Sequence, residues 1–412
     1  MKLAILSIGD ELMCGEIVDT NFAQIASILY TAGLKVSRHL TVGDDESDIA
    51  AALHTLAEDH EVIITTGGLG PTSDDRTSAA VATATGHPLQ LSPEALLHVR
   101  RVTEMFGGEM PPANEKQALI PEGALLIPNP IGTACGFQLP LSDCRLFFLP
   151  GVPREMSRML NETVMPALLA GGGERIICRT RVLKVFGPSE AELDTLLEGL
   201  APPGSGVSVA FCVDFPEIHV RLRAEGENRQ DVDATLQEAA TRARGLLKTS
   251  LFAEEHDTID AVVARLLTGK GVTLSVAESC TGGLLAKRLT DIAGSSAYFL
   301  EGAVTYSNEA KKRILHISSR LLEEKGAVSS EVALAMAAAS RYASGSDFAL
   351  AVTGIAGPDG GTPGKPVGTV FIALADRAGT ESRSYRFAGD RDEIRTITSF
   401  AALDWLRLRL MA

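Results

Sequence analysis

The stretch ITTGGLGPTSDD, Ile64 to Asp75, ends a short apolar run in three glycines, a proline and two adjacent aspartates. A second stretch, VTGIAGPDGG from Val352 to Gly361, does nearly the same far along the chain. In both, strand-forming residues stop at T-G-x-x-G-P, where glycine permits a tight turn and a close approach of the backbone to a ligand. The two loops therefore predict two α/β regions, each with a ligand site at the carboxyl end of a strand.

The fold class follows from the alternation of strands and helices around these loops. Near the first loop, LAILSI and EVIITT read as strands, and NFAQIASILYTAGL and DRTSAAVATATG read as helices. This alternation predicts a parallel sheet with helices on both faces. The segment after it, with long strands and two helices, predicts a small α+β unit. We therefore predict two outer α/β domains with mainly parallel sheets, joined by a small α+β domain.

A chain of 412 residues is too long for one ordinary core, which supports this three-domain division. We place the domains at residues 1–168, 169–252 and 253–412. The first boundary falls at GGGE, residues 171–174, and the second near EEHDTID, residues 254–260.

Bulk composition excludes several functional classes. The formal net charge of −14 disfavours a nucleic-acid-binding protein, which needs a basic face. The six cysteines are scattered without a CxxC pair, so we expect no zinc site, no disulfide framework and a reducing compartment. No run of about 18 apolar residues suggests a membrane span. We expect a cytoplasmic protein that binds neither nucleic acid nor membrane.

Two loops of the last predicted domain carry reactive side chains. In AESCTGG, residues 277–283, Ser279 follows a strand and precedes a helix start, although an ordinary helix cap would use the same residues. In TYSNEAK, residues 305–311, Lys311 would lie near a helix N-terminus, where a cation is disfavoured and the amine can act as a base. A solvated surface lysine is the alternative reading of Lys311.

These loops resemble a known family. AESCTGG, TYSNEAK, KGAVSSEVALAMA, TGIAGPDGG and KPVGTV, in this order, resemble the nicotinamide-nucleotide amidohydrolase domain of the CinA family over almost all of residues 255–412. The resemblance implies hydrolysis of nicotinamide mononucleotide to nicotinic acid mononucleotide and ammonia, without a cofactor. It implies Ser279 as the nucleophile, with Tyr306 and Lys311 as its activating partners. Cys280 is the rival nucleophile, since a helix N-terminus can activate a thiolate.

The remaining residues of this expected site follow from the same loops. Thr353 and the N–H groups after it could hold an oxyanion or the ribose phosphate. Arg391 is the expected phosphate ligand. The predicted substrate-binding residues are Glu278, Cys280, Thr281, Gly282, Asn308, Gly354, Ile355, Ala356, Gly357 and Arg391.

The first domain carries a second resemblance. SIGDELMCGEIVDTN, ITTGGLGPTSDDRT, NEKQALIPEGA, NPIGTACGF and FLPGVPREM are similar to the N-terminal domain of the CinA family, which resembles a molybdopterin-binding fold. Some members are ADP-ribose pyrophosphatases, which implies cleavage to AMP and ribose 5-phosphate here. The predicted binding residues are Gly9, Gly67, Gly68, Gly70, Pro71, Thr72, Asn129, Gly132 and Thr133.

Physical reasoning on the same stretch agrees with a phosphate substrate and a metal. Gly67, Gly68 and Gly70 predict a nest of N–H groups for an anion. Asp10, Glu11, Asp74 and Asp75 offer oxygens for a divalent cation, Mg²⁺ or similar. For the two adjacent aspartates, stabilisation of a helix start is the alternative.

The middle unit resembles the KH-type linker of the family, which can contribute Lys184 or nearby residues to the pyrophosphatase site. It departs from the family pattern in FGPSEAEL, where Ser189 replaces a glycine, and it contains no GXXG, so we expect no RNA binding. The family implies a homodimer acting on small nucleotides. Two alternatives stay open: a first domain that only binds a pterin or nucleotide, and a scaffold for competence or DNA damage.

Overall fold

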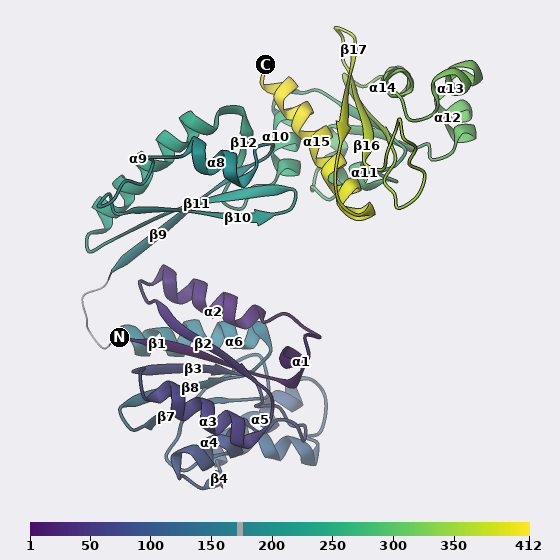
Figure 1. Ribbon diagram of the computed structural model, residues 1–412. Helices are drawn as coiled ribbons and strands as arrows, with labels where there is room; N and C mark the ends of the chain where they lie inside the picture. Colours follow the sequence, from purple (N-terminus) through teal and green to yellow (C-terminus); the bar gives the residue numbers. More distant parts are fainter. Residues whose placement is uncertain (171–175) are drawn as a thin grey trace. The chain divides into compact units, whose positions relative to one another are not determined.

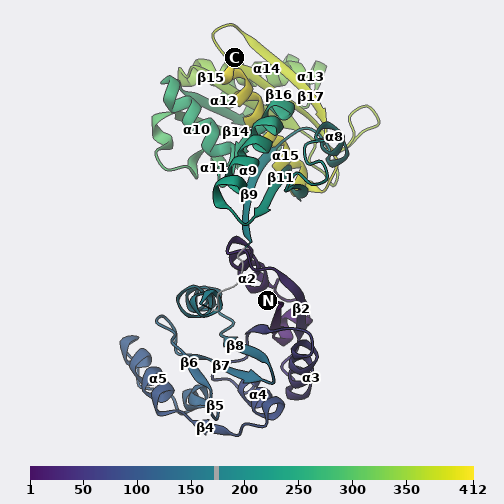
Figure 2. The same cartoon turned by 90° about the vertical axis from the view of Figure 1, so that its left-hand side faces the viewer.

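The computed structural model describes residues 1–170 and 176–412, so the predicted boundary at 171–174 lies outside the described residues. The chain divides into two compact units. The first unit contains residues 1–179 and 225–232, and the second contains residues 180–224 and 233–412. Figures 1 and 2 show the elements of each unit in two views.

The first unit is built on a six-stranded sheet with the order β2-β1-β3-β8-β7-β6. Its strands are β1 (Leu3–Ile8), β2 (Val36–Val42), β3 (Val62–Thr66), β6 (Leu125–Ile127), β7 (Gly136–Leu141) and β8 (Cys144–Leu149). The four strands from β2 to β8 are parallel, and β7 and β6 add an antiparallel edge. The sequence pattern predicted the parallel part, but not this edge.

Helices cover both faces of this sheet, as expected. They are α1 (Asp10–Met13), α2 (Thr20–Thr31), α3 (Glu46–Ala57), α4 (Thr77–Thr85), α5 (Pro93–Met105), α6 (Pro153–Met159) and α7 (Met165–Leu169), with short turns η1 (Pro112–Ala118) and η2 (Leu160–Val164). Figure 1 shows α2 and α6 on one side of the sheet and α3 and α4 on the other. A small ribbon of β4 (Leu89–Leu91) and β5 (Leu119–Pro121) completes the unit.

The strand β1 explains why the unit has two cores. Its residues are buried on both faces, and successive side chains point to opposite sides. Leu3 and Ile5 join the core that includes Ile25 and Leu29 of α2. Ala4 and Leu6 join the core on the other face. A strand buried on both faces reads as a continuous apolar run, as LAILSI does.

The middle region, from β9 to β12, resembles the KH-type linker and is called the KH-type region. It has a four-stranded sheet with the order β10-β11-β9-β12. Its elements are β9 (Ile177–Val185), α8 (Glu190–Leu196), β10 (Val207–Asp214), β11 (Glu217–Gly226), α9 (Arg229–Leu247), η3 (Lys248–Ser250) and β12 (Leu251–Glu254). Ser189, which departs from the family pattern, is the N-cap of α8 and forms a reciprocal capping box with Glu192. A serine at this position therefore has a local structural role that glycine lacks.

The last region is a five-stranded sheet with the order β14-β13-β15-β16-β17. Its strands are β13 (Leu274–Glu278), β14 (Phe299–Val304), β15 (Phe348–Gly354), β16 (Thr369–Ala375) and β17 (Thr380–Arg386). Strands β14, β13 and β15 are parallel, whereas β16 and β17 pair antiparallel. Its helices are α10 (Ile259–Lys270), α11 (Leu284–Thr290), α12 (Asn308–Leu315), α13 (Ser319–Lys325), α14 (Ser330–Ser344) and α15 (Arg391–Met411), with the turn η4 (Ser295–Ala297).

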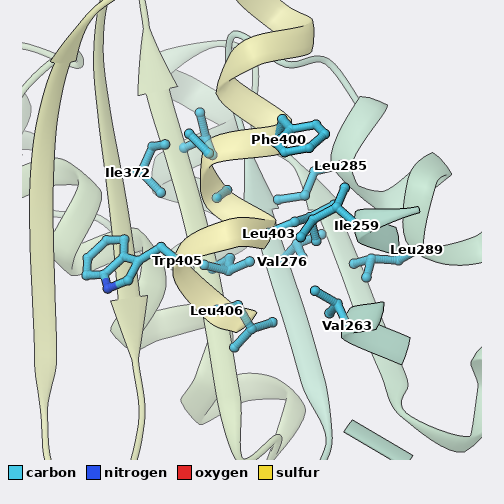
Figure 3. Close-up of a cluster of buried hydrophobic side chains, with 14 of the residues drawn as sticks. Ile259, Val263, Val276, Leu285, Leu289, Ile372, Phe400, Leu403, Trp405 and Leu406 are labelled. Carbon is cyan, nitrogen blue, oxygen red and sulfur yellow. The ribbon is translucent and has the colours of Figure 1, made fainter. Parts of the chain in front are cut away.

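The long helix α15 packs on one face of this sheet. Figure 3 shows Leu403 and Leu406 of α15 facing Val276 of β13, with α10 and α11 alongside. The other face of the sheet is covered by α12, α13 and α14 through a second core. The KH-type region shares the first of these cores, because Phe252 packs edge-on against Phe400 with ring centroids 5.2 Å apart.

These sheets confirm the predicted α/β class with a small α+β region between two α/β regions. Within the described residues, no helix is both long enough and apolar enough to cross a membrane.

Candidate active site

Ser279 is held at the carboxyl edge of the last sheet. It directly follows β13, and its backbone N–H donates to the Val352 carbonyl of β15 at 3.0 Å. The residue is only 8% exposed. Because two neighbouring parallel strands end here, the hydroxyl is fixed at the position where such sheets bind ligands.

Lys311 lies beside this serine. Helix α12 begins after Ser307, whose hydroxyl accepts from the Ala310 N–H, and this start turns Lys311 inward, where it is 1% exposed. Its Nζ donates to Ser279 Oγ at 2.9 Å and to the Thr305 carbonyl at 2.7 Å. Burial lowers the pKa of Lys311 to about 8. The alternative of a solvated surface lysine is therefore wrong, because the amine is buried and within hydrogen-bond distance of the Ser279 hydroxyl.

The turn after Thr353 also meets this loop. A Cβ added to Gly354 would lie 3.1 Å from Cys280 Sγ and 2.9 Å from the Thr369 carbonyl, so only glycine allows the two loops to approach this closely. Ile355 is tied to the start of β16 by its N–H bond to the Thr369 carbonyl. The three stretches around residues 279, 311 and 353 therefore converge at one place.

Glu278 has a different position from the one expected of a substrate ligand. It is fully buried, and its carboxylate accepts from the backbone N–H groups of Gly283, Leu285 and Ala286 at 2.8–3.1 Å. The carboxylate therefore occupies the N-terminus of α11 and satisfies donors that a ligand anion would otherwise take. Glu278 is placed to hold the AESCTGG loop, not to contact a substrate.

The structure disfavours Cys280 as the nucleophile. Cys280 is 6% exposed, and burial raises the pKa of its thiol to about 12. A thiol with this pKa is protonated at neutral pH and is a poor nucleophile. Thr353 is likewise fully buried, and its hydroxyl donates to the Ala327 carbonyl at 2.8 Å, so it supports the strand end.

Arg391 and Tyr306 form a pair at the same edge. Arg391 donates from Nη1 to the Gly357 carbonyl at 2.6 Å and from Nη2 to the Tyr306 hydroxyl at 2.9 Å. Tyr306 is 61% exposed. Across residues 1–170 and 176–412, Tyr306 forms no hydrogen bond with Ser279 or Lys311, so its predicted activating role has no contact behind it. Arg395, also on α15, donates to the Thr281 carbonyl at 3.0 Å and steadies the nucleophile loop.

The other predicted residues of this site lie where the loops turn. Gly282 has a φ of 61°, Ala356 is 5% exposed, and Asn308 is the first residue of α12.

The first unit contains a separate cavity of about 420 Å³ at the carboxyl ends of its parallel strands. Most of the residues predicted for this site line it: Gly9, Glu11, Gly67, Gly68, Gly70, Pro71, Asp74, Asp75 and Thr133. Asp10, Thr72, Asn129 and Gly132 lie outside the lining.

Two side chains that the sequence analysis missed also line the cavity. Asn21 Nδ2 donates to Thr66 Oγ1 at 3.0 Å and to the Gly151 carbonyl at 2.7 Å, which fixes the orientation of the amide. Asn21 Oδ1 and Gln117 Oε1 then have no partner among the described residues, although the two residues are only 9% and 7% exposed. A buried acceptor without a donor is costly, so the cavity favours a ligand that donates hydrogen bonds.

Three family models match separate stretches of the chain. Family models match over residues 4–170 ("Probable molybdopterin binding domain"), 180–253 ("Damage-inducible protein CinA KH domain") and 256–410 ("CinA C-terminal domain"). A CinA-like protein of Geotalea uraniireducens is 59% identical over 412 residues, covering 100% of this chain and 98% of that protein. The chain belongs to the CinA family.

Further relatives agree. A CinA-like protein of Geobacter sulfurreducens is 56% identical over 411 residues, covering 100% of each chain. The crystal structure of the competence/damage inducible protein CihA from Agrobacterium tumefaciens is 45% identical, covers 37% of this chain and 96% of its own, and has a TM-score of 0.36. The two full-length CinA-like proteins and the family models confirm the resemblance to the CinA family, while the descriptions of these relatives name no reaction.

In this member of the CinA family, two predicted features of the first cavity need correction. The N–H of Gly67 donates to the Leu149 carbonyl at 3.1 Å, so it belongs to the sheet and is not part of an anion nest. Gly67 is required because a Cβ there would lie 2.1 Å from the Ile8 carbonyl, at a φ of 111°. Asn129 is fully buried. Its Nδ2 donates to the Ala134 carbonyl and its Oδ1 accepts from the Gly132 N–H, so it holds the conformation of this loop and does not line the cavity.

The carboxylates around this cavity have the chemistry of a hard-cation site but do not form a closed cage. Burial raises the pKa of Asp44, and the nearby charges of Asp10, Glu11 and Asp74 raise it further. Such crowding of like charges is relieved by a cation. Among the described residues, only one set of three His, Cys, Asp or Glu side chains has ligand atoms within 4.8 Å of one another, and that set lies in the KH-type region. The carboxylates around this cavity therefore do not come that close together.

Proposed function

We propose that the last region is a nicotinamide-nucleotide amidohydrolase, which converts nicotinamide mononucleotide to nicotinic acid mononucleotide and ammonia. The observation that carries the proposal is the 2.9 Å hydrogen bond between Lys311 Nζ and Ser279 Oγ, made by an amine whose pKa burial lowers to about 8. The reaction class follows from this dyad, and the nucleotide substrate follows from the resemblance to the family.

The first half of the reaction forms an ester. When the Lys311 amine is neutral, the Ser279 O–H donates to Nζ across this contact, and the amine removes the proton while Oγ attacks the carboxamide carbon. The resulting ammonium then returns this proton to the amide nitrogen as the C–N bond breaks, and ammonia leaves. The Thr305 carbonyl, 2.7 Å from Nζ, keeps the amine oriented in both protonation states.

The second half releases the acid. Lys311 removes a proton from water, the resulting hydroxide attacks the ester carbon, and Ser279 regains its proton as the nicotinic acid product leaves. The N–H of Ser279 is bonded to the Val352 carbonyl, so the donors for the oxyanion belong to the neighbouring turns. Arg391 supplies the positive charge expected to anchor the substrate phosphate.

Product analysis of the full chain by mass spectrometry tests this assignment. Incubation with nicotinamide mononucleotide should give nicotinic acid mononucleotide and one ammonia for each substrate consumed. The Ser279→Ala variant should give neither product. Formation of nicotinamide and ribose 5-phosphate instead would reject amide hydrolysis, because a glycosidic bond would then be the one cleaved.

A second activity is favoured by the cavity of the first unit. We propose that this cavity binds ADP-ribose and that water cleaves its pyrophosphate to AMP and ribose 5-phosphate. The unpartnered acceptors of Asn21 and Gln117 suit ribose hydroxyls or an exocyclic amine. Glu11, Asp74 and Asp75, with Asp10 and Asp44 beside them, supply oxygen ligands for Mg²⁺ or a similar ion. When bound, such an ion would neutralise the charge of the pyrophosphate.

Both substrates are breakdown products of NAD, so the two activities together describe pyridine-nucleotide recycling by a cytoplasmic homodimer. Incubation of the full chain with ADP-ribose and Mg²⁺ separates this proposal from a binding module. Release of AMP, lost in an Asp74→Asn/Asp75→Asn variant, supports catalysis. Binding of ADP-ribose without release of AMP would leave the amidase as the sole activity.

A further inference from the structure

A hairpin of the KH-type region carries side chains that neither proposed reaction uses. The stretch DFPEIH, residues 214–219, joins β10 to β11. The strands are antiparallel, and Asp214 lies directly opposite Glu217. Because side chains alternate along a strand, Glu217 and His219 lie on one face, and the cross-strand neighbour Asp214 lies on the same face.

The three side chains meet at their polar atoms. His219 Nε2 lies 2.6 Å from Glu217 Oε1 and 3.6 Å from Asp214 Oδ2. One ligand atom of each residue lies within 4.8 Å of those of the other two, and the described part of the chain contains no other such group of His, Cys, Asp or Glu. A single ion at the centre of the group could reach all three with small side-chain rotations.

The surroundings favour a cation in this place. The side chains of Glu217 and His219 are each only 12% exposed, and that of Asp214 is 68% exposed. Lys184 Nζ lies 3.4 Å from Glu217 Oε1 and can orient that carboxylate. The local charge from Asp214, Glu217 and Lys184 is negative by one unit when His219 is neutral. The competing arrangement is an ion-pair network in which a protonated His219 takes the place of a metal.

A cavity of about 330 Å³ adjoins the hairpin within the second unit. Lys184, Asp214 and Glu217 line one side of it, and residues of α10, α11 and α15 line the other. On that far side, Arg288 is already paired with Asp260 at 2.7 Å, so it adds no net charge. The cavity leaves room for an ion to keep a bound water as a further ligand.

We propose that Asp214, Glu217 and His219 bind a divalent transition-metal ion of the Zn²⁺ or Co²⁺ type. One imidazole nitrogen and two carboxylates are a donor set that Zn²⁺ and Co²⁺ accept, whereas Mg²⁺ prefers an all-oxygen site. The site lies outside the dyad of Ser279 and Lys311 and outside the cavity of the first unit, so it stands without the proposed function. The sequence signal is D-x-x-E-x-H across a hairpin turn.

Cobalt titration of the metal-free full chain tests the proposal, because Co²⁺ reports its ligands by visible absorption. We expect one Co²⁺ per chain with the intense visible bands of a four- or five-coordinate ion, retained in excess Mg²⁺. His219→Gln should weaken this binding at least about tenfold. The matched variant Asp194→Asn, which removes an exposed acid from α8 of the same region, should bind Co²⁺ like the wild type.

A second variant separates this site from the predicted Mg²⁺ site. Asp74→Asn/Asp75→Asn should leave the visible bands unchanged. Far-ultraviolet circular dichroism should show that every variant is folded, and Glu217→Gln serves as a second ligand variant in case His219→Gln is not. The proposal is overturned if the wild type gives no such bands, if excess Mg²⁺ removes them, or if folded His219→Gln and Glu217→Gln proteins bind Co²⁺ like the wild type.

Discussion

Lys311 donates a 2.9 Å hydrogen bond to Ser279 from a position 32 residues later in the chain. The contact joins the end of β13 to the first turns of α12, with both side chains almost fully buried. Across residues 1–170 and 176–412 no carboxylate forms an ion pair with this buried amine, so its cationic form is costly, and burial is the main cause of its lowered pKa. This one contact brings together the proposed nucleophile, at the end of β13, and its proposed base, within α12.

The choice of nucleophile is tested by two neighbouring substitutions. Ser279→Ala should lower amidase kcat by roughly a thousandfold or more, since the attacking oxygen is lost. Cys280→Ala should keep kcat within about tenfold of the wild type, because a thiol with a pKa of about 12 is protonated and serves only packing. Steady-state assay of ammonia release measures both. A Cys280→Ala protein without activity, beside an active Ser279→Ala protein, would assign the cysteine instead.

The amidase should depend on pH through Lys311. The amine is the base only when neutral, and its pKa is about 8, so kcat/KM should rise as pH increases and level off above that value. At pH 6 the rate should lie about a hundredfold below the plateau. A pH series of kcat/KM measures this. A flat profile between about pH 6 and 9 would show that Lys311 is not the base.

The same shift predicts a stability change. The pKa of Lys311 in the fold lies below its ordinary value of 10.5, so the unfolded chain binds the extra proton more readily and stability rises with pH between about 8 and 10.5. At pH 7, Lys311→Met should raise the free energy of unfolding of the second unit by up to roughly 3 kcal/mol while abolishing activity. Urea unfolding of the wild type and of Lys311→Met at about pH 7 and pH 10 measures the difference in their free energies of unfolding. An equal difference at the two pH values would contradict the linkage.

Tyr306→Phe separates a catalytic role from a binding role. The hydroxyl accepts from Arg391 and not from the dyad, so its removal should raise KM for nicotinamide mononucleotide by less than about tenfold and leave kcat nearly unchanged. Arg391→Lys, which loses the two-point contact with Gly357 and Tyr306, should raise KM more strongly. If Tyr306→Phe instead lowered kcat by a thousandfold, the tyrosine would belong to the proton-transfer machinery.

Asn21 tests the cavity of the first unit. Asn21→Ala removes the unpartnered Oδ1 and should raise KM for ADP-ribose by about tenfold, through loss of one hydrogen bond to a ligand donor. Amidase activity should not change, because that site lies in the other unit. The exposed Asn161 serves as a control, and Asn161→Ala should leave both activities unchanged. Equal KM values for wild type and a folded Asn21→Ala protein would remove Asn21 from the binding surface.

The division into α/β, α+β and α/β regions could be predicted from the sequence because strand and helix periods involve only neighbouring residues. The strand LAILSI and the strand before Gly67 are each encoded in fewer than eight consecutive positions. The glycine turns at residues 67 and 354 were predicted for the same reason, since a close approach of backbones excludes a Cβ.

The tertiary structure alone decided which side chains meet and which are out of contact with water. Burial lowers the pKa of Lys311 and raises that of Cys280, and the neighbours of these residues along the chain do not reveal this burial. The Glu278 carboxylate accepts hydrogen bonds from backbone N–H groups at the N-terminus of α11. Asn21 donates from Nδ2 to Thr66 and Gly151, which leaves its Oδ1 without a partner among the described residues. Each outcome depends on residues brought together by packing, and both pKa and hydrogen-bond satisfaction depend on that packing and not on local pattern.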